Sequence, residues 1–199
     1  DVSGDMSLQA NVGVRDVHDA AVDVEGSFAM ATETYAAKMA FDSLMLNHYV
    51  VLEDTAVFSG EVSVQGEGLD FFSPHTVLQA VACLSDSHFG KIDLNNIQAD
   101  VALRGRKLLA NVLCDNSQLQ AQLKLDTELQ KHLIDGSLDI DVPLVDIQSM
   151  GFSEERMQAS SQGAVMFSYD WDEHFSVDSH IDVLSLQVRK DSVRAENID

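Results

Sequence analysis

Residues that interrupt or crosslink a fold are scarce in this 199-residue chain, which holds two prolines and two cysteines. Cys83 and Cys114 are too few for a disulfide scaffold, and they could pair or stay free, so they indicate no redox compartment. Pro74 predicts a break between two groups of strands, and Pro143 predicts an edge or a bulge in its strand. We therefore expect one elongated β-sheet segment over residues 1–199, with a possible subdivision near 73–75.

Positive charge is also scarce in the chain. There are 12 Lys and Arg residues against 33 Asp and Glu residues, which gives a formal net charge of −21. An outer surface this acidic disfavours DNA, RNA and anionic lipid headgroups as partners. The charge does not exclude contact with lipid tails, which are neutral. The apolar content of 45% is typical of a folded protein and argues against disorder.

Long hydrophobic runs are missing. No stretch of about 20 apolar residues could span a membrane as a helix, and no signal peptide is present. The chain starts with Asp1-Val2-Ser3-Gly4 and not with methionine, so we expect a piece of a longer protein. An export signal or a membrane anchor would then lie outside this piece.

Catalytic and metal-binding motifs are not found either. HExxH, paired CxxC, GxSxG and a phosphate-cradling glycine loop are all missing, and the seven histidines are scattered. The nearest approach to a cluster is the segment from Asp172 to His180, which we interpret as a solvated turn and a wet strand face. Asp139 and Asp141 lie on one face of one strand without the loop glycine of an EF-hand. The sequence predicts no enzyme, no cofactor and no metal site.

The most regular feature of the sequence is an alternation of apolar and polar residues. In GSLDIDVPLVDI, residues 136–147, apolar residues occupy every second position from Leu138 to Val142, with Asp139 and Asp141 between them. Successive side chains of a strand point to opposite faces of a sheet, so this segment predicts a strand with one apolar and one acidic face. The same period recurs over nearly the whole chain and predicts 12 to 16 strands.

Short connections between these segments predict an antiparallel meander. Turns are expected at the following residues: Gly60, Gly66, Gly68, Asn95-Asn96, Gly105, Asp115-Asn116 and Asp135-Gly136. Helical periodicity is rare, although residues 126–134 could form one or two turns and residues 76–84 are ambiguous, because both of their phases are partly apolar.

Two ways of covering the apolar faces remain open. The chain could form a two-sheet β-sandwich with a closed core, or one long sheet curled into a trough with an apolar interior. Periodicity alone does not choose between the two, and without further information we expect the sandwich or a barrel. If the chain forms a trough, we expect its lining in one phase of the alternation: Val62, Val64, Val101, Leu103, Leu119, Leu123, Leu138, Ile140, Val142, Val165 and Phe167.

Three segments carry a resemblance to a known family: SVQGEGLDFFSPHTVLQA (63–80), FGKIDLNNIQADVALRGRKLLANVLCDN (89–116) and DGSLDIDVPLVDIQSMGF (135–152). Together they resemble the translocation and assembly module (TamB) and AsmA-like family, in a form similar to that of Bacteroides-type bacteria. The resemblance runs over most of the chain, and GEGLDFFSP is its most distinctive stretch. It concerns a middle segment of such proteins, and it shifts the expectation from the sandwich to the trough.

Membership of this family would imply a periplasmic β-sheet folded over an apolar interior, a shape called a β-taco, with an inner-membrane anchor outside the fragment. It would imply a non-enzymatic hydrophobic groove for lipid transport between membranes or for outer-membrane protein assembly. The implied partners are phospholipid acyl chains or unfolded outer-membrane β-strands, and an outer-membrane assembly protein, with no nucleic acid. The alternative function is a structural or adhesive β-sandwich module of a cell-surface protein.

Overall fold

A computed structural model describes residues 7–15, 20–171, 174–189 and 191–198. The secondary structure is almost entirely β. Its elements are β1 (Ser7–Arg15), β2 (Ala21–Ala29), β3 (Thr34–Met45), the 3-10 helix η1 (Leu46–His48), β4 (Ala56–Glu67), β5 (Val77–Phe89), β6 (Ile92–Asp93), β7 (Ile97–Arg104), β8 (Lys107–Asp115), β9 (Leu119–Leu129), β10 (Leu133–Asp146), β11 (Met157–Asp170), β12 (His174–Val188) and β13 (Asp191–Ile198).

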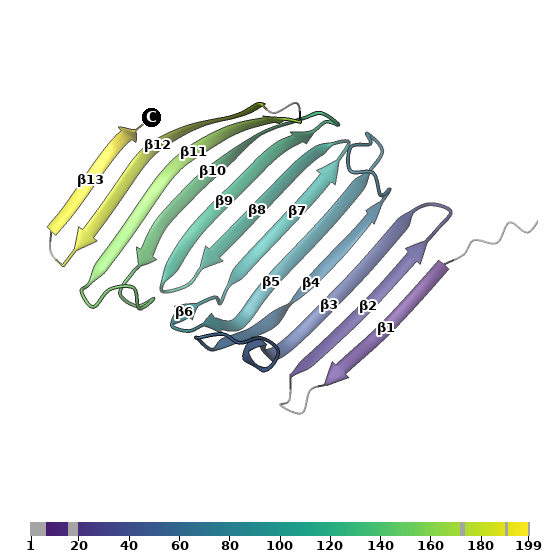
Figure 1. Ribbon diagram of the computed structural model, residues 1–199, viewed down its shortest axis with the longest axis horizontal. Helices are drawn as coiled ribbons and strands as arrows, with labels where there is room; N and C mark the ends of the chain where they lie inside the picture. Colours follow the sequence, from purple (N-terminus) through teal and green to yellow (C-terminus); the bar gives the residue numbers. More distant parts are fainter. Residues whose placement is uncertain (1–6, 16–19, 172–173, 190, 199) are drawn as a thin grey trace, which may run out of the picture.

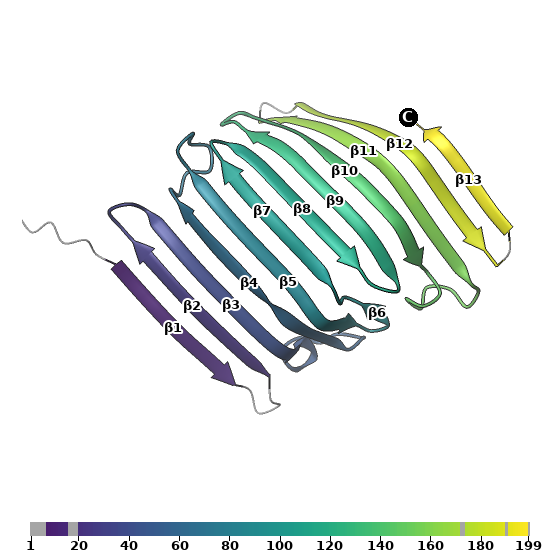
Figure 2. The ribbon, with the colours of Figure 1, turned by 180° about the vertical axis from the view of Figure 1, so that it is seen from behind.

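All the described strands belong to a single antiparallel sheet. Twelve follow one another along the sheet in sequence order, and the short β6 pairs only with β5 (Figure 1). The sheet does not close into a barrel and has the form of an open, curled trough. Both views show the strands side by side in one layer (Figures 1 and 2). The predicted meander and strand number are confirmed, and the two-sheet sandwich is wrong for the described residues.

The two ends of the sheet carry different kinds of connection. One end, which we call the η1 end, holds η1, β6 and the long connections 46–55 and 147–156. The other, which we call the Gly105 end, holds mainly tight turns such as Gly105-Arg106 between β7 and β8. Pro74 lies at this end, in the connection between β4 and β5, which pair with each other directly. The possible subdivision near 73–75 stays a prediction.

Several expected turns lie inside strands instead. Gly60 and Gly66 belong to β4 and Gly136 belongs to β10, so the turn predictions at these positions are wrong. Close neighbours explain the glycines: a Cβ on Gly66 would lie 2.5 Å from Tyr35 Oη, and one on Gly136 would lie 2.5 Å from Thr127 Oγ1. Gly68 and Gly105 do sit in connections, with positive φ angles of 81° and 54°.

The expected helical turns at 126–134 are also wrong. Strand β9 continues to Leu129, and β10 starts at Leu133 after a short turn. Lys107 pairs with Glu128 on one side of β9, and Asp135 pairs with Glu128 on the other. Two flanking strands therefore satisfy the backbone hydrogen bonds of this segment, and they override its weak helical pattern. The ambiguous residues 77–84 form part of β5.

Bulges lie in the half of the sheet toward the η1 end. The register shifts between Phe41 and Leu44, between Val57 and Ser59, and between Asp141 and Leu144. The last of these contains Pro143, so the predicted bulge is confirmed. A bulge bends its strand and increases the local twist, which gives the long sheet its curvature.

A buried polar network fixes the η1 end. The Ser87 hydroxyl is 1% exposed and accepts a hydrogen bond from Ser59 N at 3.0 Å. Asn116 Nδ2 donates to Asp93 O at 3.0 Å, and Asn116 Oδ1 accepts from Leu119 N at 2.8 Å. These bonds tie the β6 segment to its neighbours through satisfied polar groups, which specify one arrangement of the loops.

The surface area confirms how open the molecule is. The chain exposes 13270 Å². A compact monomer of 21.8 kDa exposes about 9,300 Å². Only five apolar residues of the described part are buried: Ala20, Ala56, Leu103, Cys114 and Met150. The fold therefore has no closed hydrophobic core of ordinary size.

Candidate hydrophobic face

The eleven residues predicted as a lining all lie on the same face of the sheet, which we call the apolar face. Two cross-strand rows carry most of them. The first, the Leu123 row, runs through β4–β10 as Val62, Ala82, Ala99, Val112, Leu123 and Ile140. The second, the Val64 row, runs through β4–β11 as Val64, Ala80, Val101, Ala110, Leu125, Leu138 and Val165.

The remaining lining residues flank these two rows. Leu103 pairs with Leu78 and Leu108 in a third row, the Leu103 row, which lies toward the Gly105 end and reaches Phe167 on β11. Leu119 pairs with Val145, and Val142 pairs with Ser161, toward the η1 end. The structure thus brings together residues that are more than 100 positions apart, because a meander keeps one phase of the alternation on one face.

Side chains on the apolar face cover one another more than those on the opposite, polar face. Val81, Leu109 and Leu113 point to the polar face and are 47%, 44% and 38% exposed. Val101 and Leu123 on the apolar face are half-buried, and Leu103 is 2% exposed. No other layer covers the apolar face within the described residues, so this burial comes from neighbouring side chains of the same sheet. Toward the flanks the same face is more open, with Leu8 at 59% and Phe175 at 67%.

A row of small residues crosses the middle of the apolar face. In β1, β2 and β3 the Val64 row continues as Ala10, Gly26 and Ala37. From β1 to β8 this row contains no side chain larger than valine. Bulkier residues border it toward the Gly105 end, among them Phe28 and Tyr35. Six strand spacings of about 4.8 Å give this row of small residues a length of about 29 Å.

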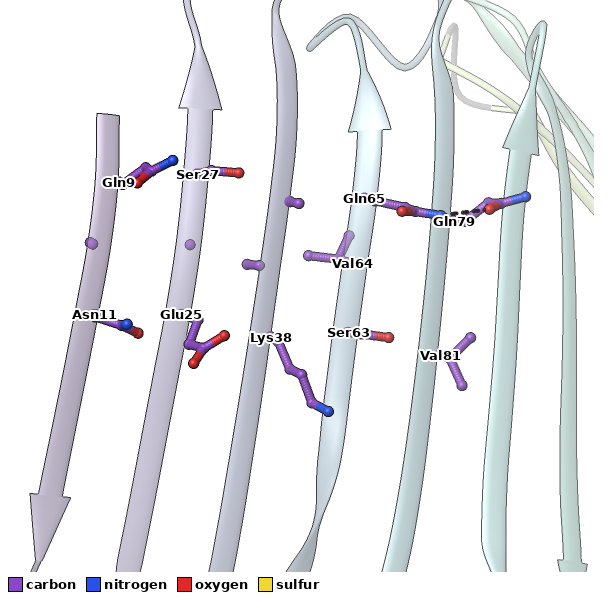
Figure 3. A pocket seen from close by; sticks show the side chains of 14 residues that line it. Gln9, Asn11, Glu25, Ser27, Lys38, Ser63, Val64, Gln65, Gln79 and Val81 are labelled. Carbon is purple, nitrogen blue, oxygen red and sulfur yellow. Dashed lines mark hydrogen bonds between the residues drawn. The ribbon is translucent and has the colours of Figure 1, made fainter. Parts of the chain in front are cut away.

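Two hollows lie on the polar face, where sequence reasoning expected only solvated residues. One, of about 620 Å³, is lined by strands β1–β5 (Figure 3). The other, of about 740 Å³, crosses β5–β10. The polar side chains that line the first hollow are Gln9, Asn11, Glu25, Ser27, Lys38, Ser63, Gln65 and Gln79. Amide side chains at alternate strand positions were the signal in the sequence that could have predicted this first hollow.

Two pairs of polar side chains interact in and beside the first hollow. Gln65 Nε2 donates to Gln79 Oε1 at 3.0 Å (Figure 3). Lys38 Nζ lies 2.9 Å from Glu61 Oε2, and this hydrogen bond and charge raise the pKa of Lys38 above its ordinary value. These pairs engage Gln65, Gln79 and Lys38, and the ion pair with Glu61 offsets the charge of the one lysine in the lining.

The two cysteines are free, and they lie on opposite faces. Cys83 pairs with Glu61 and Gln98 on the polar face, whereas Cys114 pairs with Ile97 and Ala121 on the apolar face. Cys114 is 5% exposed, and burial raises the pKa of its thiol, helped by the charges of Asp93 and Asp115. This environment keeps Cys114 protonated and makes it a weak nucleophile.

The titratable groups form no recognisable reactive site in the part of the chain that the structure describes. Within these residues, no three His, Cys, Asp or Glu side chains are grouped so that they could hold a metal ion. His180 Nε2 lies 3.3 Å from Asp182 Oδ1, while Asp172 and Glu173 lie outside the described residues. Asp139 and Asp141 are exposed on the polar face, as predicted.

No helix of the described residues is both long enough and apolar enough to cross a membrane. Comparison of the chain with models of known protein families, with curated proteins and with solved structures gives no match. The geometry of the sheet is therefore the basis for the functional argument that follows.

Proposed function

We propose that this chain is a non-enzymatic segment of a TamB- or AsmA-like protein whose apolar face binds the hydrophobic chains of phospholipids. The observation that carries the proposal is the continuous apolar face, which spans the sheet and is left open to solvent in a single-layer fold. Soluble proteins rarely leave a contiguous apolar surface this large without a partner.

The shape and chemistry of this face fit an acyl chain. Removing a methylene from water is worth about 0.8 kcal/mol, so a chain of about 14 methylenes gains roughly 11 kcal/mol before the cost of ordering it. The row of small residues through Ala10, Ala37, Ala80 and Ala110 leaves room along the long direction of the sheet. Transport between membranes would then need no catalytic residue, because a tail could slide along a uniform lining.

The same face could also hold the apolar side of unfolded outer-membrane β-strands, which is the second candidate. The open sheet weighs against the structural or adhesive sandwich module, since that function needs two facing sheets and a closed core. A periplasmic location, an inner-membrane anchor outside this segment and an outer-membrane assembly partner belong to the proposal as well.

Photo-crosslinking from matched positions tests the proposal. A photoreactive amino acid at position 123 or 140 lies on the apolar face, and one at position 122 or 141 lies on the polar face. With vesicles of phosphatidylethanolamine and phosphatidylglycerol, we expect the purified chain to capture phospholipid from 123 and 140 but not from 122 and 141. The crosslinked adduct can be identified by mass spectrometry.

Two results would contradict the proposal. Equal capture from both faces would mean that lipid does not select the apolar face. Chain-to-chain crosslinks from 123 and 140, with no lipid adduct and a dimer in sedimentation, would mean that a second copy covers this face and completes a sandwich.

A further inference from the structure

Three polar side-chain atoms in the described part of the chain are buried without a hydrogen-bond partner: Tyr35 Oη, Arg106 Nε and Thr127 Oγ1. All three lie toward the Gly105 end of the sheet. Tyr35 and Thr127 stand in the Leu103 row of the apolar face, and Arg106 follows at the adjoining Gly105 end. A buried donor without an acceptor destabilises a protein, so their gathering along one rim requires an explanation.

Arg106 belongs to a tight hairpin turn, and a basic residue flanks this turn on each strand. Gly105 and Arg106 have positive φ angles of 54° and 74° and form the two-residue turn between β7 and β8. Arg104 and Lys107 pair with each other and are exposed on the polar face. Arg106 stands in the turn itself, where its side chain is half-buried and its Nε is buried without a hydrogen-bond partner.

Thr127 lies next to this turn on β9. It pairs with Leu108 and is 3% exposed, and Leu129, two residues later, donates its N–H to Arg106 O at 2.8 Å. Thr127 Oγ1 and the ring of Phe167 both occupy the space above Gly136.

Neighbouring acidic side chains that the structure describes do not pair with the guanidinium of Arg106. Lys107 pairs with Asp126 at 3.0 Å on the polar face, whereas Arg106 forms no ion pair among the described residues. Neither the Leu103 row nor the Val64 row contains an Asp or Glu between β1 and β11. An arginine and a hydroxyl beside an acid-free apolar surface match an anionic oxygen group, above all phosphate.

We propose that Arg106, with Thr127 as a second donor, binds the phosphate headgroup of an amphiphile whose tail lies along the row of small residues. The inference rests on the proposed function and adds the position and charge of the headgroup. Ala110 in that row is four residues from Arg106, about 13 Å along β8. The net charge of −21 repels anions from the outer surface, whereas the Leu103 and Val64 rows carry no carboxylate from β1 to β11.

Titration of the full chain with three probes tests this site. The probes are dodecyl phosphate, the neutral dodecyl maltoside and inorganic phosphate, each followed by calorimetry below its micelle concentration. We expect Arg106→Gln to weaken binding of dodecyl phosphate about tenfold and to leave dodecyl maltoside unchanged. Arg104→Gln, in the same turn but on the polar face, should change neither. Inorganic phosphate alone should bind far more weakly than dodecyl phosphate.

Thr127→Val separates binding from packing. This substitution keeps the shape and removes a buried hydroxyl that has no partner, so the unfolding midpoint should rise. Because Thr127 is the second donor, the affinity for dodecyl phosphate should fall at the same time, and an unchanged affinity would contradict its role. Circular dichroism confirms that each variant keeps its β structure.

Several outcomes would overturn the inference. If both dodecyl probes bind the wild-type chain and Arg106→Gln affects neither, the headgroup site is wrong and the proposed function stands. Equal losses from Arg106→Gln and Arg104→Gln would mean unspecific charge attraction. Inorganic phosphate that binds as tightly as dodecyl phosphate would mean a free-phosphate site. If neither dodecyl probe binds the wild-type chain, the proposed function fails together with the inference.

Discussion

The two faces of this sheet are built from the same strands and the same alternation, yet they meet different requirements. On the polar face, Lys38 pairs with Glu61, and Gln65 pairs with Gln79, so exposed groups satisfy one another or water. On the apolar face, Val101 and Leu123 are half-buried by their neighbours and by nothing else. The polar face thus needs no other layer, whereas no second layer of the described residues covers the apolar face.

A charge placed on the apolar face should give the largest effect on stability, and a charge placed on the polar face should give little. Leu123→Asp places a carboxylate between Val112 and Ile140, and we expect a loss of about 2–4 kcal/mol in the free energy of unfolding. The neighbouring Gln122→Lys stands opposite Asp141 on the polar face and should change stability by less than about 0.5 kcal/mol. Urea unfolding followed by fluorescence or circular dichroism measures both. Equal shifts in the two variants would show that the faces are assigned wrongly.

Two glycines on the apolar face sharpen the comparison with a smaller effect. A Cβ on Gly66 would lie 2.5 Å from both Tyr35 Oη and the Val77 carbonyl oxygen, so Gly66→Ala should cost about 1–3 kcal/mol. A Cβ on Gly26 would meet nothing nearer than Ala36 O at 3.8 Å. Gly26→Ala should therefore be neutral or stabilise by up to about 1 kcal/mol, because alanine restricts the unfolded chain. Thermal unfolding distinguishes the two, and similar midpoints would mean that Tyr35 does not cover Gly66.

Asp146 should give the smallest effect, on the polar face. Ser149 N donates to Asp146 Oδ1 at 3.1 Å, and this bond holds the pKa of Asp146 below its ordinary value. A lowered pKa adds stability above the unfolded value of about 3.9, and this stability is lost as the pH falls through the folded value. Asp146→Asn should therefore cost a few tenths of a kcal/mol at pH 7 and nothing near pH 2. A gap between the two proteins that stays constant with pH would contradict this role.

The sequence predicted the strands of this fold better than its turns. Residues 138–142 and 119–125 alternate so regularly that both their strand state and their inward phase follow from the pattern. Gly60, Gly66 and Gly136 misled the prediction, because a glycine in a strand and a glycine in a turn look alike in sequence. Their places in β4 and β10 depend on Tyr35, Cys83 and Phe167, which come from other strands.

The candidate site, like the fold, was predicted only in part from the sequence. Every predicted lining residue is on one face, since alternation within a meander fixes that result. The orphaned donors Arg106 and Thr127 could not be found from sequence, because RGRK reads as a solvated turn. Only the hairpin geometry separates Arg106 from Arg104, and only the pairing of β8 with β9 places Thr127 beside it.

By itself, the sequence determined that this chain forms an antiparallel β-sheet with one apolar and one polar face, because side chains of a strand alternate with a period of two. It left open whether that apolar face closes onto a second sheet. The tertiary structure decided this point: β1 to β13 pair edge to edge in one layer, and bulges such as the one at Pro143 curve it without folding it shut. Closure depends on the accumulated twist and register of all the strands together, and no local pattern of residues encodes that sum.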